Sequence, residues 1–81
     1  MTIKVTFLNK DEILGAIVRA LAVQVAGFQV VGGLNKNYLK ANGFYPFIFA
    51  NSSQVERFKS LIKCYVPSEF QASLQIAEDS N

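Results

Sequence analysis

The stretch "GFYPFIFANSS", residues 43–53, decides the fold. It places four aromatic side chains between Phe44 and Phe49 and then turns polar. Aromatic residues favour strands, whereas Asn and Ser favour the first positions of helices. Ser53 and Glu56 also have the spacing of a capping box, in which two side chains satisfy free backbone N–H groups. The stretch therefore predicts a strand that leads into a helix.

The alternation of side chains along this strand predicts two different faces. We expect Phe44 and Ile48 to face the helices. Tyr45, Phe47 and Phe49 would then form an aromatic row on the other face of the sheet. A partner protein, a second copy of the chain, single-stranded nucleic acid, residues 34–43 or the C-terminal tail could each cover such a row, because monomers rarely leave large apolar surfaces exposed.

Two elements are predicted on the N-terminal side of this stretch. Residues 3–8, "IKVTFL", alternate apolar and polar side chains with the period of a strand. Asn9 and Glu12 then have capping-box spacing, and apolar residues at helical spacing predict a helix to Ala26. Gly27 is expected to end this helix.

The remaining elements complete the predicted order. Residues 28–31, "FQVV", are expected to form a second strand, and residues 70–77, "FQASLQIA", a fourth. Residues 35–43 could form a polar loop or a short helix, capped by Asn35 at its start and by Gly43 at its end. The helix that begins near Ser53 should end by Val66, because Pro67 follows.

The resulting order is β-α-β-β-α-β. It predicts an α+β, ferredoxin-like sandwich, in which an antiparallel four-stranded sheet carries two helices on one face. Residues 1–77 would form one domain, and residues 78–81 a flexible acidic tail.

Sparse charge suggests that part of the surface is covered by another protein. The chain has 81 residues, of which 51% are hydrophobic and only 17% charged, against about 25% in typical domains. The back of the first predicted helix is also rich in small residues. We expect Ala16, Arg19 and Val23 on this side to contact a second subunit or a partner.

The residues that usually carry out chemistry are missing. There is no histidine, and one cysteine, Cys64, cannot hold a structural zinc ion. No glycine-rich phosphate loop occurs. We therefore expect no enzyme and no cofactor. A single cysteine without a signal peptide favours the cytoplasm, and Arg19 in the middle of the apolar stretch 13–31 argues against a membrane span.

The segment "NGFYPFIFA", residues 42–50, resembles the third-strand signature of RNA recognition motifs, whose exposed aromatics stack on bases. The resemblance implies stacking by Tyr45 and Phe47, with Lys4, Lys36 and Lys40 as nearby cations. The segment departs from that signature, because Phe44 stands where the family has Gly and Pro46 where it has a small residue. Amino-acid-binding regulatory domains of the ACT type are similar in element order only.

The function that this sequence favours is a small, non-enzymatic protein–protein interaction module, such as a regulator, inhibitor or assembly subunit. It would act through the aromatic sheet face or the small-residue back of the first helix, on a partner or on its own copy. The alternatives are a single-stranded nucleic-acid binder and a small-ligand regulatory domain. A net charge of only +2 makes nucleic acid the less favoured partner.

Overall fold

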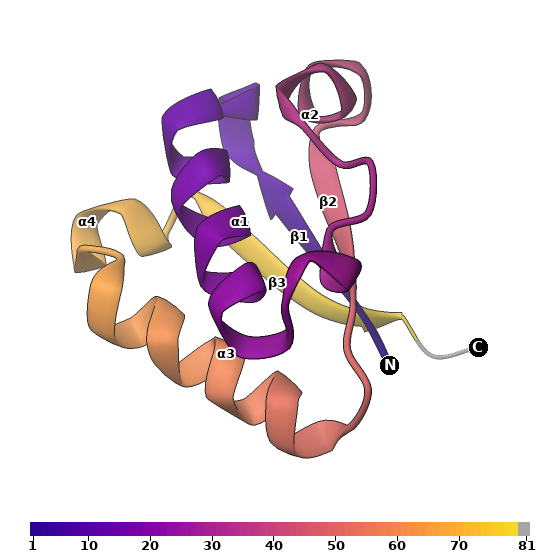
Figure 1. The fold of residues 1–81 in the computed structure, drawn as a ribbon. Helices are drawn as coiled ribbons and strands as arrows, with labels where there is room; N and C mark the ends of the chain where they lie inside the picture. The colour runs from indigo at the N-terminus through magenta and orange to yellow at the C-terminus, as the bar shows by residue number, and fades with distance from the viewer. Residues whose placement is uncertain (80–81) are drawn as a thin grey trace.

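A computed structural model describes residues 1–79 of the chain as three strands and four α-helices (Figure 1). The strands β1 (Thr2–Phe7), β2 (Phe44–Ile48) and β3 (Leu74–Asp79) form one antiparallel sheet in the order β2-β1-β3. The helices are α1 (Glu12–Ala26), α2 (Lys36–Asn42), α3 (Ser52–Tyr65) and α4 (Ser68–Gln71), and the 3-10 turns are η1 (Leu8–Lys10) and η2 (Phe28–Val30). The long helices α1 and α3 cover one face of the sheet (Figure 1).

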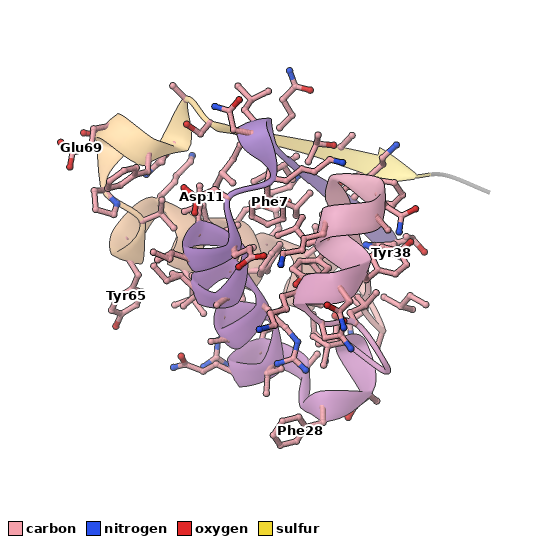
Figure 2. All side chains as sticks on the ribbon, turned by 90° about the horizontal axis from the view of Figure 1, so that it is seen from above. Phe7, Asp11, Phe28, Tyr38, Tyr65 and Glu69 are labelled. Atoms are coloured by element: carbon pink, nitrogen blue, oxygen red, sulfur yellow. The ribbon has the colours of Figure 1, made fainter. Side chains whose placement is uncertain are left out.

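The ferredoxin-like, four-stranded prediction is wrong, because residues 28–31 do not form a strand. Their backbone bonds are local: Val30 N–H donates to Gly27 O and Val31 N–H to Phe28 O, both at 3.2 Å. Val30 and Val31 are buried, while Phe28 projects from the turn into solvent (Figure 2). A short apolar run can fill the end of a core from a turn as well as from a strand, and periodicity alone does not distinguish the two.

The central strand β1 organises the sheet. Its odd residues Ile3, Val5 and Phe7 are buried beneath the helices, as its alternation predicts. In the register with β2, Ile3 lies opposite Phe47 and Val5 opposite Tyr45. These strand residues therefore share one face and form the floor of the core.

The aromatic row occupies the opposite face from the one predicted. Tyr45, Phe47 and Phe49 are all buried under the helices, whereas Ile48 is 62% exposed. The ring of Phe58 on α3 lies 5.5 Å from that of Phe47 and 5.0 Å from that of Phe49. The strand is apolar on both sides, so the sequence held no polar residue to fix its phase; packing against Phe58 fixes it.

Pro46 fits because β2 is an edge strand rather than a central one. Phe7 N–H donates to Gly43 O, which makes the odd residues of β1 and β2 the hydrogen-bonded pairs. Lys4 and Pro46 form a pair between them, so the nitrogen of Pro46 points away from β1. A missing N–H at that position costs the sheet no hydrogen bond.

The helix ends follow capping chemistry, although two caps differ from the predicted ones. Asp11, not Asn9, caps α1 through its carboxylate, and Asn51, not Ser53, caps α3. The open choice for residues 35–43 resolves to the helix: the Asn35 side chain caps α2, and Gly43 ends it at a φ of 81°.

The C-terminal strand begins later than predicted and ends later. Residues 68–71 form the short helix α4, and β3 then pairs with β1 from Leu74 to Asp79. Glu78, assigned to the tail by the sequence, belongs to this strand and lies 3.5 Å from Lys59 of α3. Residues 80–81 of the predicted tail lie outside the described part of the chain.

The two faces of β2 give a sharp mutational test. Phe47→Ala should lower the free energy of unfolding by about 3–5 kcal/mol, because it empties a closed part of the core. Ile48→Ala, one residue away on the exposed side, should change it by no more than about 0.5 kcal/mol. Urea denaturation of both variants measures the difference, and equal losses would contradict the assigned phase.

Candidate interaction surfaces

The small-residue side of α1 is largely covered by the chain itself. A Cβ atom built on Gly15 would lie 2.6 Å from Cδ2 of Leu39 and 3.5 Å from Cε2 of Tyr45. Gly15 therefore allows α2 to pack directly on α1, with Leu39 completely buried between them. Residues 34–43, one of the expected covers of the aromatic row, contact Tyr45 of that row through Tyr38. Through Leu39 they also cover this side of α1.

The predicted helix-back residues do not form one exposed surface. Arg19 is partly buried and donates from Nε to the carbonyl of Leu34 at 2.9 Å, which ties the segment after η2 to α1. Val23 is half-buried against the core. Of the three, Ala16 alone is exposed.

The aromatic residues predicted to bind partners are core residues. Tyr45 stacks on Tyr38 of α2 at 6.3 Å and meets Phe7 edge to face at 5.7 Å. Figure 2 shows Phe7 in the interior and Tyr38 on α2, toward the opposite side from α4. Phe47 and Phe49 pack against α3. In the folded chain none of these rings is available to a base or to a partner.

The lysines named for nucleic-acid binding are dispersed over different surfaces. Lys36 is exposed on α2, and Lys40 pairs with Glu12 of α1 at 2.9 Å. Lys4 lies on the sheet, with its Nζ 4.3 Å from the centre of the Phe44 ring. The resemblance to RNA recognition motifs loses its basis because Tyr45 and Phe47 are buried, and the resemblance to ACT-type domains because the sheet has three strands.

The sheet face away from α1 and α3, here called the open face, was predicted as an interaction surface, but the sequence prediction assigned the wrong β2 residues to it. Its β1 positions are Thr2, Lys4 and Thr6, and its β3 positions include Gln75 and Ala77. Its β2 positions are all apolar: Phe44, Pro46 and Ile48. Tyr38 reaches over the edge of β2 and packs edge to face on Phe44 at 5.9 Å. The sequence signal was present, because these three residues alternate with the aromatic row.

A shallow groove adjoins the open face along the outer edge of β2. Its volume is about 450 Å³, and its lining is mostly apolar. Residues 29–34 form one wall, and Tyr38, Pro46 and Ile48 form the other. The groove extends the apolar surface of β2 around the edge of the sheet.

Residues 1–79 contain no group of three or more His, Cys, Asp or Glu side chains placed to hold a metal ion. Cys64 is exposed on α3. Within the same residues, no helix has the length and apolarity that crossing a bilayer requires. The absence of an enzymatic activity and of a cofactor stays a prediction.

No known protein family, no curated protein and no solved structure matches this chain. What it binds must therefore be inferred from its own surfaces.

The contact between Gly15 and α2 predicts a specific destabilisation. Gly15→Ala should lower the free energy of unfolding by about 1–3 kcal/mol, because the added methyl overpacks against Leu39. Shortening the neighbour in a Gly15→Ala/Leu39→Val double variant should give a smaller loss than the sum of the two single losses. Gly33→Ala is the control, because no atom lies within 4 Å of a Cβ at that position. Equal effects at Gly15 and Gly33 would contradict this packing.

The buried phenol of Tyr45 predicts a loss of stability at high pH. Burial raises its pKa above the ordinary value of 10.0, the charge of Arg19 lowers it in part, and that of Glu12 raises it further. The unfolded chain thus releases the Tyr45 proton at a lower pH than the folded chain. The contribution of the protonated Tyr45 side chain to the free energy of unfolding is complete below pH 10. It is lost as the pH rises through the folded-state pKa.

Urea denaturation between neutral pH and a pH above 10 should therefore show a steeper loss of stability for the unmodified chain than for Tyr45→Phe. The two proteins differ only in the Tyr45 hydroxyl, so the difference between their pH profiles isolates Tyr45. Superimposable pH profiles would contradict the assignment.

Proposed function

We propose that this protein is a non-enzymatic interaction module that binds a protein partner through the open face of its sheet. One observation carries the proposal: β2 places Phe44, Pro46 and Ile48 on a face that neither α1 nor α3 covers. An antiparallel sheet with one solvated face normally carries polar side chains on that face. An apolar strip there is characteristic of an interaction site.

The charge on this face defines the chemistry of the partner. Lys4 is the only charged side chain on the open face among strand residues 2–7, 44–48 and 74–78. Its ammonium group lies over the ring of Phe44, beside the apolar strip. Such a surface complements an apolar protein surface bordered by carboxylates, because the carboxylates would pair with Lys4. Thr2, Thr6 and Gln75 would supply hydrogen bonds around it.

Nucleic acid is the less favoured ligand for the same face. Base stacking along a strand typically uses several exposed aromatic rings within a basic groove. Among strand residues 2–7, 44–48 and 74–78, the open face offers the single ring of Phe44 and the single cation of Lys4. A partner that matches the apolar strip therefore fits this surface better than a polyanion does.

A site-specific photocrosslinker tests the proposal. Introduced at Ile48, it should yield a discrete adduct with one protein in the source cells, whereas the same group at the exposed Ala20 of α1 should not. The partner, once identified and purified, should bind the unmodified chain and lose at least about tenfold in affinity for Ile48→Lys. The partner surface that carries the crosslink should be apolar with acidic neighbours.

The Ile48→Lys variant must still unfold cooperatively. We expect this because the Ile48 side chain is 62% exposed, so a lysine there can reach solvent. A nuclease-sensitive adduct at Ile48, or equal adducts from Ile48 and Ala20, would overturn the proposal. Unchanged affinity of the purified partner for Ile48→Lys would overturn it as well.

A further inference from the structure

The two outer edges of the sheet differ in how they are covered. The edge of β2 is flanked by α2 and by the η2 segment, as Tyr38 and the groove along Pro46 show. Pro46 also removes the outward N–H at the middle of that strand. Within the described residues, β3 pairs with β1 on one side, and no strand pairs with its other edge. An unpaired sheet edge presents free N–H and C=O groups to which another strand can pair.

The ladder geometry identifies which backbone groups of β3 are free. Leu8 N–H donates to Ser73 O at 3.0 Å, so residues 73, 75 and 77 of this segment bond to β1. The N–H and C=O groups of Leu74, Ile76 and Glu78 therefore point away from the sheet. The strand residues 74–78 contain no proline and no lysine that would block pairing along this edge.

The core is also incomplete along this edge. The helix-facing residues of β1 and the helix-facing Tyr45 and Phe47 of β2 are at most 2% exposed, but Ile76, which faces the same way, is 37% exposed. Ile76 lines a groove of about 240 Å³ between β3 and the outer side of α3. A further strand with its own helix would bury Ile76 and close this groove.

We propose that β3 pairs antiparallel with β3 of a second copy of this chain, about a two-fold axis at Ile76. This register places Ile76 opposite itself and Leu74 opposite Glu78 of the partner subunit. Every outward backbone group of the three residues is then paired, with about six hydrogen bonds across the interface. The two three-stranded sheets become one continuous sheet.

Charge complementarity on α3 favours a second copy over an unrelated strand. Glu56, Lys59, Ser60 and Lys63 line the groove beside Ile76. Lys59 already pairs with Glu78, while Glu56 and Lys63 take part in none of the ion pairs of residues 1–79. They lie seven positions apart, on one side of α3.

A two-fold axis at Ile76 brings the two copies of α3 together in opposite directions. Glu56 then lies opposite Lys63 of the partner subunit, and Lys63 opposite Glu56 of the partner subunit. Exposed ion pairs of this kind fix the register of an interface more than they add affinity. The β3 edge lies outside the apolar strip of the open face, so this proposal stands independently of the proposed function.

The first test is the mass of the purified full-length chain by light scattering across micromolar concentrations. We expect twice the 9.0 kDa of one chain. Ile76→Lys should remain folded, because its side chain can extend into the groove toward solvent, and should raise the dissociation constant about a hundredfold or more. Ile48→Lys, the same change on the open face, should leave the dimer intact.

A cysteine pair tests the register without a destabilising charge. In a Cys64→Ser background, Ile76→Cys should form an intermolecular disulfide on mild oxidation, because opposed residues of a hydrogen-bonded pair lie about 5.5 Å apart at Cα. Gln75→Cys is the control, since position 75 faces position 77 of the other copy and lies about 7–8 Å from its own equivalent. It should crosslink much more slowly.

The charge pairs predict a reversal. Glu56→Lys and Lys63→Glu should each weaken the dimer, and the double variant should restore it. A monomer at all concentrations overturns the proposal. A dimer that is lost with Ile48→Lys but kept with Ile76→Lys, or a Gln75→Cys crosslink as fast as that of Ile76→Cys, overturns it equally.

Discussion

The phase of β2 against β1 is the constraint on which the rest of this structure depends. With Pro46 opposite Lys4 in a pair that exchanges no hydrogen bonds, the proline nitrogen points outward and the neighbouring aromatics point at the helices. A shift of one residue would place Pro46 in the ladder and move Phe47 off the ring of Phe58. Hydrogen bonding and packing therefore select the same register.

This phase also determines what the molecule shows to its surroundings. The rings of Tyr45, Phe47 and Phe49 are used in the core, and they help a chain of 81 residues to build a hydrophobic core without a disulfide. Phe44, Pro46 and Ile48 of β2 are left on the open face. Gly15 on α1 also affects which surfaces are covered. Because it has no side chain, α2 packs directly on α1 and covers the edge of β2.

The two proposals follow from this unequal covering of the sheet. The helices lie on one face, and α2 with the η2 segment flanks one edge. The opposite face and the β3 edge remain for partners. Pairing of two β3 strands would also join two open faces into one larger surface, so a partner could contact both copies at once and gain affinity from doing so.

The sequence by itself determined the elements whose signals are local. The alternation of residues 3–8, the glycine end of α1 and the apolar periodicity of α3 depend on neighbours along the chain, and each is present in the structure. Where the chain offered two equal choices, only tertiary packing decided. Residues 28–31 suit a strand or a turn, and β2 is apolar on both faces. The ring of Phe58 on α3 decided the phase of β2, and burial of Val30 and Val31 accompanies the turn, because a local pattern carries no information about contacts that form only when the chain has closed.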